Sequence, residues 1–149
     1  MEVLQQLTQN NPLYFSFLFP MLTDGIVTLL GQDKTYWKNH RSANEASPAY
    51  FFMAIHPILY ILGAIVWFIG LYLVFLQIPH PFNLIVALGF IAGNSWGSSS
   101  WIAQILRKKC VYSQSNRTSI LLFWSILVLY FLLIGAFATI FLSLYFEQK

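Results

Sequence analysis

Four long apolar stretches follow one another along this 149-residue chain, and short polar segments separate them. Each stretch is long enough to cross a bilayer, because about 30 Å of hydrocarbon takes roughly 20 helical residues. We therefore predict an all-α integral membrane protein whose four transmembrane helices form an antiparallel bundle in one domain over residues 1–149. The predicted spans cover residues 13–31, 48–77, 82–106 and 119–146.

The composition supports a membrane protein and excludes a soluble one. Hydrophobic residues make up 58% of the chain and charged residues 9%, whereas a soluble domain carries about 25% charged residues. Seven of the eight Lys and Arg residues lie in two segments, residues 32–47 and 107–118. Because basic loops stay on the cytoplasmic side, we expect both segments there and both termini on the opposite side. A chain this apolar gives no support for binding nucleic acid, and membrane lipids are its expected partners.

Asp24 is the most unusual residue of the predicted spans. It lies eight residues before Gln32, and hence about 12 Å below the cytoplasmic boundary of its helix. A lone charge at the bilayer centre costs about 2.5 to 3.5 kcal/mol, so Asp24 should be protonated, paired or in contact with water. The same count places polar residues of the second and third spans at a similar depth. The predicted intramembrane cluster comprises Asp24, Thr28, His56, Asn94 and Ser98.

The role of this cluster stays open at the level of sequence. Intramembrane polar groups often only hydrogen-bond between helices, but a proton or ion relay would use the same residues. One His and one Asp are too few for a metal shell, so we predict no metal site, and the sequence indicates no particular cofactor. Pro57 adds a second alternative. Since proline is favoured in a first helical turn, a helix that starts there would move His56 to the headgroup level.

Glycines mark the predicted helix contacts. In the third span they recur every four residues, and in the second they alternate with large side chains. A bare glycine face lets another helix approach closely, which favours association in lipid. The contact could lie within the bundle or between copies in a homo-oligomer. The predicted packing residues are Gly63, Gly70, Gly89, Gly93 and Gly97.

The first basic segment is the longest polar stretch and carries groups of mixed charge. His40, Arg41, Asn44 and Glu45 could contact an anionic headgroup or the loop of a partner protein. The alternative is a solvated loop that only sets the topology.

Two families resemble parts of this pattern. Asp24-x3-Thr28, followed by Asn44-Glu45 and Pro48, is similar to small uncharacterised bacterial four-helix membrane proteins, and the run Trp96-Gly97-Ser98-Ser99-Ser100-Trp101 has a cyanobacterial look. This resemblance implies a bacterial inner or thylakoid-type membrane and carries no established activity.

The second resemblance is to the MAPEG membrane glutathione transferases, which share the length, the helix number and the orientation of the termini. Arg41, Asn44, Glu45 and Pro48 resemble the residues at the start of that family's second helix, although Asn and Glu are adjacent here. The resemblance implies an enzyme that acts on a lipophilic substrate.

From the residues themselves we expect a protein without enzymatic activity, which serves as an accessory or assembly subunit of a larger membrane complex. The first alternative is a small transporter or proton-linked channel component that uses Asp24. The second is a MAPEG-like membrane enzyme that uses His40, Arg41 and Glu45, with His56 as a further candidate.

Overall fold

The computed structural model describes residues 2–109, 111–112 and 116–148, and these residues form helices joined by short segments. No strand occurs in them. Residues 110 and 113–115 of the second basic segment lie outside the described residues. The helices are α1 (Glu2–Asn10), α2 (Pro12–Leu30), the 3-10 helix η1 (His40–Ser42), α3 (Ala49–Ile55), α4 (Pro57–Phe75), α5 (Phe82–Lys108) and α6 (Arg117–Glu147).

Three of these helices, α2, α4 and α6, are long and apolar enough to cross a membrane. Three such helices are typical of a multi-pass membrane protein. Helix α5 has 27 residues, which is long enough, but its glycines, serines and Asn94 make it less apolar than the other three. The third predicted span, and with it the count of four, therefore stays a prediction.

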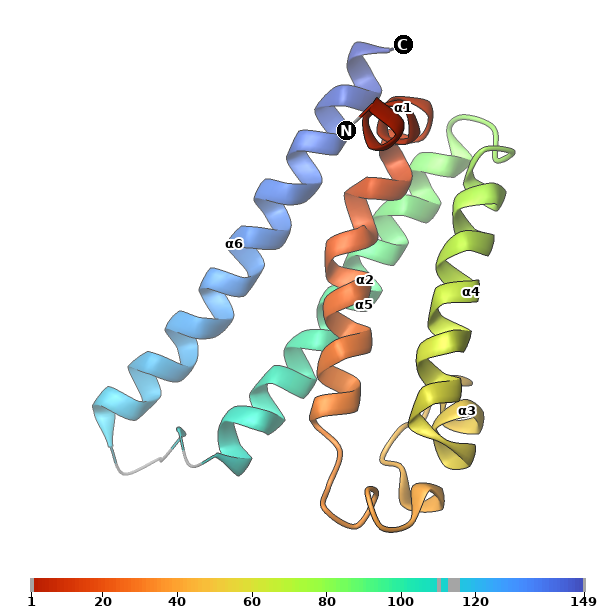
Figure 1. The fold of residues 1–149 in the computed structure, drawn as a ribbon. Coiled ribbons are helices and arrows are strands. Elements are labelled where there is room, and N and C mark those ends of the chain that lie inside the picture. The colour runs from red at the N-terminus through yellow and green to blue at the C-terminus, as the bar shows by residue number, and fades with distance from the viewer. Residues whose placement is uncertain (1, 110, 113–115, 149) are drawn as a thin grey trace.

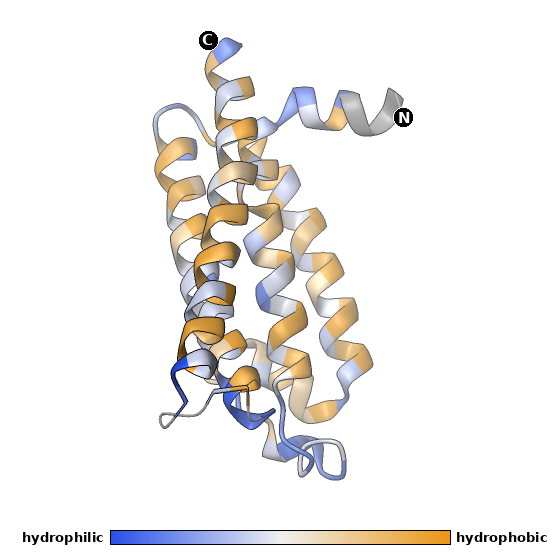
Figure 2. Cartoon of the chain, turned by 90° about the vertical axis from the view of Figure 1, so that its left-hand side faces the viewer, coloured by the Kyte–Doolittle hydropathy of each residue, from blue (hydrophilic) through white to orange (hydrophobic). Residues whose placement is uncertain are grey.

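Both termini lie at one end of the bundle, which we call the termini end (Figure 1). The first basic segment, the last turn of α5 and the first turn of α6 lie at the opposite end, which we call the loop end. Figure 2 shows hydrophilic residues at both ends of the bundle, including most of the loop end, whereas the long helices between them are largely hydrophobic.

Prolines and their capping residues decide where the helices begin. Helix α2 starts at Pro12, and the Asn11 side chain accepts a hydrogen bond from the Tyr14 N–H. Helix α4 starts at Pro57, and His56 accepts one from the Ile58 N–H. The structure thus divides the segment predicted as one span over 48–77 into α3 and α4. The division falls at His56, whose backbone is extended, because a residue before proline is disfavoured in the helical region.

Helix α2 is the central element, and it packs against α4, α5 and α6. The ring of Phe17 stacks on Phe90 of α5 with centroids 5.0 Å apart. The ring of Phe19 contacts Phe137 of α6 at 5.4 Å. Helices α4 and α5 separate beyond their connecting turn (Figure 1), so α4 contacts mainly α2 and α3.

The largest apolar core lies in the half of the bundle nearest the termini end. Its residues come from α2, α4, α5 and α6, and aromatic rings fill most of it. In a membrane protein the outer helix surfaces contact lipid, which explains why many large apolar side chains are exposed. The buried residues of this core are Leu13, Tyr14, Phe17, Met21, Leu71, Phe75, Ala87 and Tyr145.

Candidate functional site

The Asp24 carboxylate lies against the backbone of Gly97, where α2 meets α5. A Cβ atom added to Gly97 would lie 2.7 Å from Asp24 Oδ1, so a larger residue at position 97 would make the Asp24 carboxylate shift. Asp24 is half-buried. Among the described residues, neither a hydrogen bond nor an ion pair joins its carboxylate to another group.

The other polar residues predicted near Asp24 share its part of the bundle but turn to different neighbours. Ser98 follows Gly97 directly, yet its hydroxyl is hydrogen-bonded to the Tyr130 hydroxyl of α6. Asn94 donates to the Phe90 carbonyl at 2.8 Å. Thr28 is buried one turn beyond Asp24 on α2. The structure therefore brings Asp24 beside Gly97 and directs Asn94 and Ser98 to other partners.

His56 lies apart from these residues, at the loop end. It is exposed and caps α4, with its Nδ1 atom 3.2 Å from the Ile58 N–H that donates to it. Its ring centroid lies 5.1 Å from that of His40. The helix start at Pro57 agrees with the alternative that Pro57 indicated, and the headgroup level of His56 stays a prediction.

The first basic segment is tied to the bundle by the side chain of Gln32. The Asn44 N–H donates to Gln32 Oε1 at 2.8 Å, and Gln32 Nε2 donates to the Thr28 carbonyl at 3.0 Å. These bonds hold residue 44 beside the last turn of α2. The same bonds keep the neighbouring Glu45 near the loop end of α2.

Two tyrosines fix the same segment to α3. Tyr36 is fully buried and donates to the Met53 carbonyl at 3.3 Å, and burial raises the pKa of its hydroxyl above the ordinary value. Tyr50 donates to the Arg41 carbonyl at 3.1 Å. The segment thus has a built structure, whereas a loop that only sets the topology would need none.

Glu45 comes close enough to Asp24 and to Tyr60 of α4 to act on both electrostatically. The Tyr60 hydroxyl donates to the Gly25 carbonyl at 3.0 Å, which places it beside Asp24. We call Asp24, Glu45, Tyr60 and Gly97 the acidic site. Tyr60 is not part of the predicted intramembrane cluster, because only the folded first segment places Glu45 within electrostatic range of it.

The acidic site contains no cation that balances its carboxylates. Within residues 2–109, 111–112 and 116–148 the structure has one salt bridge, between Lys108 and Asp33 at 2.8 Å. Lys108 also donates to the Gly31 carbonyl at 2.6 Å, so these contacts of Lys108 are with residues outside the acidic site. Two unbalanced carboxylates favour uptake of a proton or a cation. No group of three or more metal-ligating side chains occurs among the described residues.

The predicted packing glycines divide into two groups. Besides Gly97, Gly63 is in contact, because a Cβ there would lie 3.5 Å from the Phe52 ring. A Cβ on Gly70, Gly89 or Gly93 would meet nothing within 4 Å. A step of four residues advances about 40° beyond a full helical turn, and hence Gly89 and Gly97 point to different sides of α5.

The side of α5 that carries Gly89 and Gly93 has no neighbour within the described chain. Trp96, on the same side, is 77% exposed. This surface, which we call the open face of α5, combines small residues with a few large apolar side chains. Its residues are Ile85, Leu88, Gly89, Ala92, Gly93, Trp96 and Ser100.

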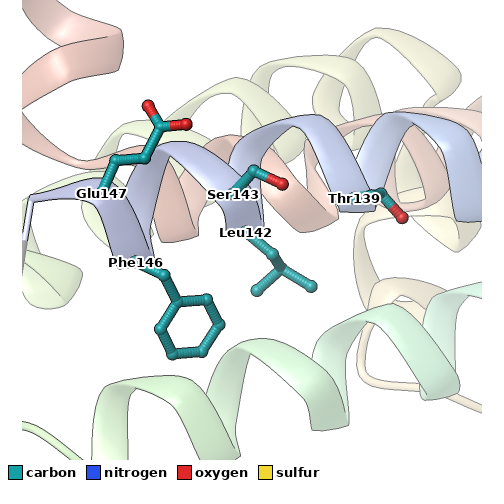
Figure 3. A pocket seen from close by; sticks show the side chains of 5 residues that line it. All are labelled: Thr139, Leu142, Ser143, Phe146 and Glu147. Atoms are coloured by element: carbon teal, nitrogen blue, oxygen red, sulfur yellow. The ribbon is translucent and has the colours of Figure 1, made fainter.

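Surface depressions offer no better site. Figure 3 shows one along α6 near the termini end, which is open to the outside and lined by a single helix. Its lining residues are Thr139, Leu142, Ser143, Phe146 and Glu147.

Comparisons with known proteins give no family for this chain, since no protein-family model, no curated protein and no solved structure matches it. The two resemblances drawn from its motifs therefore stay predictions.

Proposed function

We propose that this protein is an accessory or assembly subunit of a larger membrane complex and that it docks through the open face of α5. We further propose that the loop end faces the cytoplasm of a bacterial inner or thylakoid-type membrane. The basic segments at that end support this orientation. Labelling of cysteines introduced at each end with a membrane-impermeant reagent in intact cells tests it.

The open face of α5 is the observation that carries the docking proposal. Helix α5 is the least apolar of the long helices, and it leaves Gly89 and Gly93 without any contact. In lipid, helices associate mainly by close van der Waals packing between faces of small residues. A flat face of Gly and Ala beside Trp96 is therefore better covered by another helix than by acyl chains.

The test is purification of the tagged protein in mild detergent, with three variants side by side. Gly89→Leu and Gly93→Leu add bulk to the open face, and Gly135→Leu adds the same bulk to α6, where a Cβ also meets nothing within 4 Å. We expect a stoichiometric partner to be retained by the wild type and by Gly135→Leu, and lost from the other two. The proposal would be contradicted if all four forms retained the partner, or if the wild type purified without any partner protein.

The acidic site favours a second candidate function, a small transporter or proton-linked channel component. Its support is the pair of carboxylates, Asp24 and Glu45, with which no Lys or Arg of the described part of the chain forms a salt bridge. A carboxylate inside a membrane span commonly marks a proton or ion pathway.

Proton flux into proteoliposomes that contain a pH-sensitive dye distinguishes the two functions. A transporter should lose flux when Asp24→Asn removes the charge and should keep it with Glu147→Gln, which removes a carboxylate at the termini end. An accessory subunit should show no flux in any form and should keep its partner with Asp24→Asn. Size-exclusion profiles of each variant confirm that folding is intact.

A further inference from the structure

Helix α3 extends the lipid-facing surface of α4 around the loop end. Phe51 is 70% exposed and Ile55 66% exposed, and their large apolar side chains continue into Ile58 and Leu59 on the first turn of α4. Since α4 is long and apolar enough to cross a membrane, its outer surface contacts acyl chains. Helix α3 then lies where that surface reaches the headgroups.

Hydrogen-bond donors stand beside this apolar edge. The Tyr50 hydroxyl, on the first turn of α3, binds the Arg41 carbonyl, so the backbone of Arg41 is fixed next to α3 and its exposed side chain is free to extend. The His40 and His56 rings adjoin each other at the start of α4. Because His56 Nδ1 accepts from the Ile58 N–H, its neutral ring carries its proton on Nε2 and can donate to an outside acceptor.

The charges at the loop end favour an anion there. Seven of the eight Lys and Arg residues occur at this end, against two carboxylates, Asp33 and Glu45. Asp33 is paired with Lys108, and Glu45 accepts from the Ser47 N–H. Within the described residues, no carboxylate pairs with Arg41. A zwitterionic headgroup brings its own cation, whereas an anionic headgroup complements this surface.

We propose that Arg41, His40 and His56 bind the phosphate of an anionic phospholipid whose acyl chains run along Phe51 and Ile55. The guanidinium supplies charge-assisted donors, and the imidazoles supply further donors beside it. The apolar edge of α3 sets the depth of the headgroup. The site is separate from the open face of α5, so it stands or falls independently of the docking function.

The experiment uses the purified full chain in nanodiscs with spin-labelled phosphatidylglycerol and spin-labelled phosphatidylcholine, and it measures the motionally restricted fraction of each lipid. We expect the wild type to prefer phosphatidylglycerol. Arg41→Gln should lower that preference about fivefold, the value of one charge near an anionic surface. Its fold should be intact, because the hydrogen bonds made at Arg41 use the backbone.

Arg117→Gln is the matched control, because it removes the same charge from the other basic segment. A preference that Arg117→Gln leaves intact and Arg41→Gln lowers supports the site. An equal loss of the phosphatidylglycerol preference in both variants would show diffuse electrostatic attraction and would overturn the proposed site. A wild type that does not prefer phosphatidylglycerol would overturn it as well. Displacement of the lipid by millimolar inorganic phosphate would show that the site takes free phosphate, and it would overturn the lipid assignment.

Discussion

The two ends of the bundle use α2 in different ways. Near the termini end, α2 is surrounded by aromatic rings from α4 and α5, and Phe17 is fully buried among them. Toward the loop end, α4 and α5 move apart, and α2 meets the Gly97 backbone and the folded first segment instead of another ring cluster. The polar groups of the acidic site occupy this second region.

This difference teaches that stability and candidate chemistry are separated along the helix axes. A close-packed aromatic core tolerates little change of volume, and it would exclude water from a carboxylate. The loop end is held by a few hydrogen bonds to backbone carbonyls, from Gln32, Tyr36, Tyr50 and Tyr60. Such a region can change its protonation or its ligands while the core keeps the helices together.

The largest expected effect comes from emptying the core. Phe17→Ala should lower the free energy of unfolding by about 3 to 5 kcal/mol, the usual cost of removing a buried aromatic ring. Phe82→Ala removes a ring that is 62% exposed and should cost far less. Reversible unfolding in mixed micelles measures both values. Similar losses from the two variants would show that the core is not concentrated around Phe17.

A smaller effect is expected where the carboxylate meets glycine. Gly97→Ala places a methyl group 2.7 Å from Asp24 Oδ1 and should destabilise the fold by about 0.5 to 1.5 kcal/mol, because the Asp24 side chain must leave its present rotamer. Gly93→Ala, where a Cβ meets nothing, should be neutral or slightly stabilising. The double variant Asp24→Ala/Gly97→Ala should recover most of the loss. If the double variant lost as much stability as the two single variants together, the close contact between Asp24 and Gly97 would be contradicted.

The helical nature of the chain and its lipid-facing segments could be predicted from hydropathy alone, because length and composition decide whether a helix can span. The position of Asp24 along its helix could be counted from the sequence, and its depth in the membrane stays a prediction. The rotation of each helix about its own axis could not be predicted in this way. Glycines four residues apart suggest one helix face, but each step turns about 40° further around α5. Gly97 therefore packs on Asp24, whereas Gly89 and Gly93 contact no other helix.

The folded first segment could not be predicted for a different reason. Its ties to the bundle run from side chains to backbone carbonyls and amides, as between Gln32 and Asn44, and such bonds leave no periodic signal in the sequence. The acidic site depends on the fold of the first segment, because this fold places Glu45 within electrostatic range of Asp24. The position of His56 was foreseeable, since Pro57 indicates a helix start.

Tyr36 gives the loop end its own dependence on pH. Burial raises the pKa of its hydroxyl above the ordinary 10.0, so the folded protein keeps this proton at a pH where the unfolded chain has lost it. The stability from Tyr36 is thus fully present below pH 10 and falls as the pH rises further. Tyr36→Phe should lose the bond to Met53 and flatten that alkaline decrease. A decrease just as steep in the variant would assign it to other tyrosines.

The finest comparison uses two tyrosines that make the same kind of bond between α2 and α4, one in each half of α4. Tyr14 donates to the Phe68 carbonyl and Tyr60 to the Gly25 carbonyl, each at 3.0 Å. Tyr14→Phe and Tyr60→Phe should each cost about 0.6 kcal/mol, the usual value of a hydrogen bond between membrane helices. If the ends differ as described, amide exchange in detergent should rise throughout the N-terminal turns of α4 for Tyr60→Phe. For Tyr14→Phe the change should stay local, because the aromatic core still holds α4 there. Equal spreading in both variants would mean that the loop end is as firmly packed as the termini end.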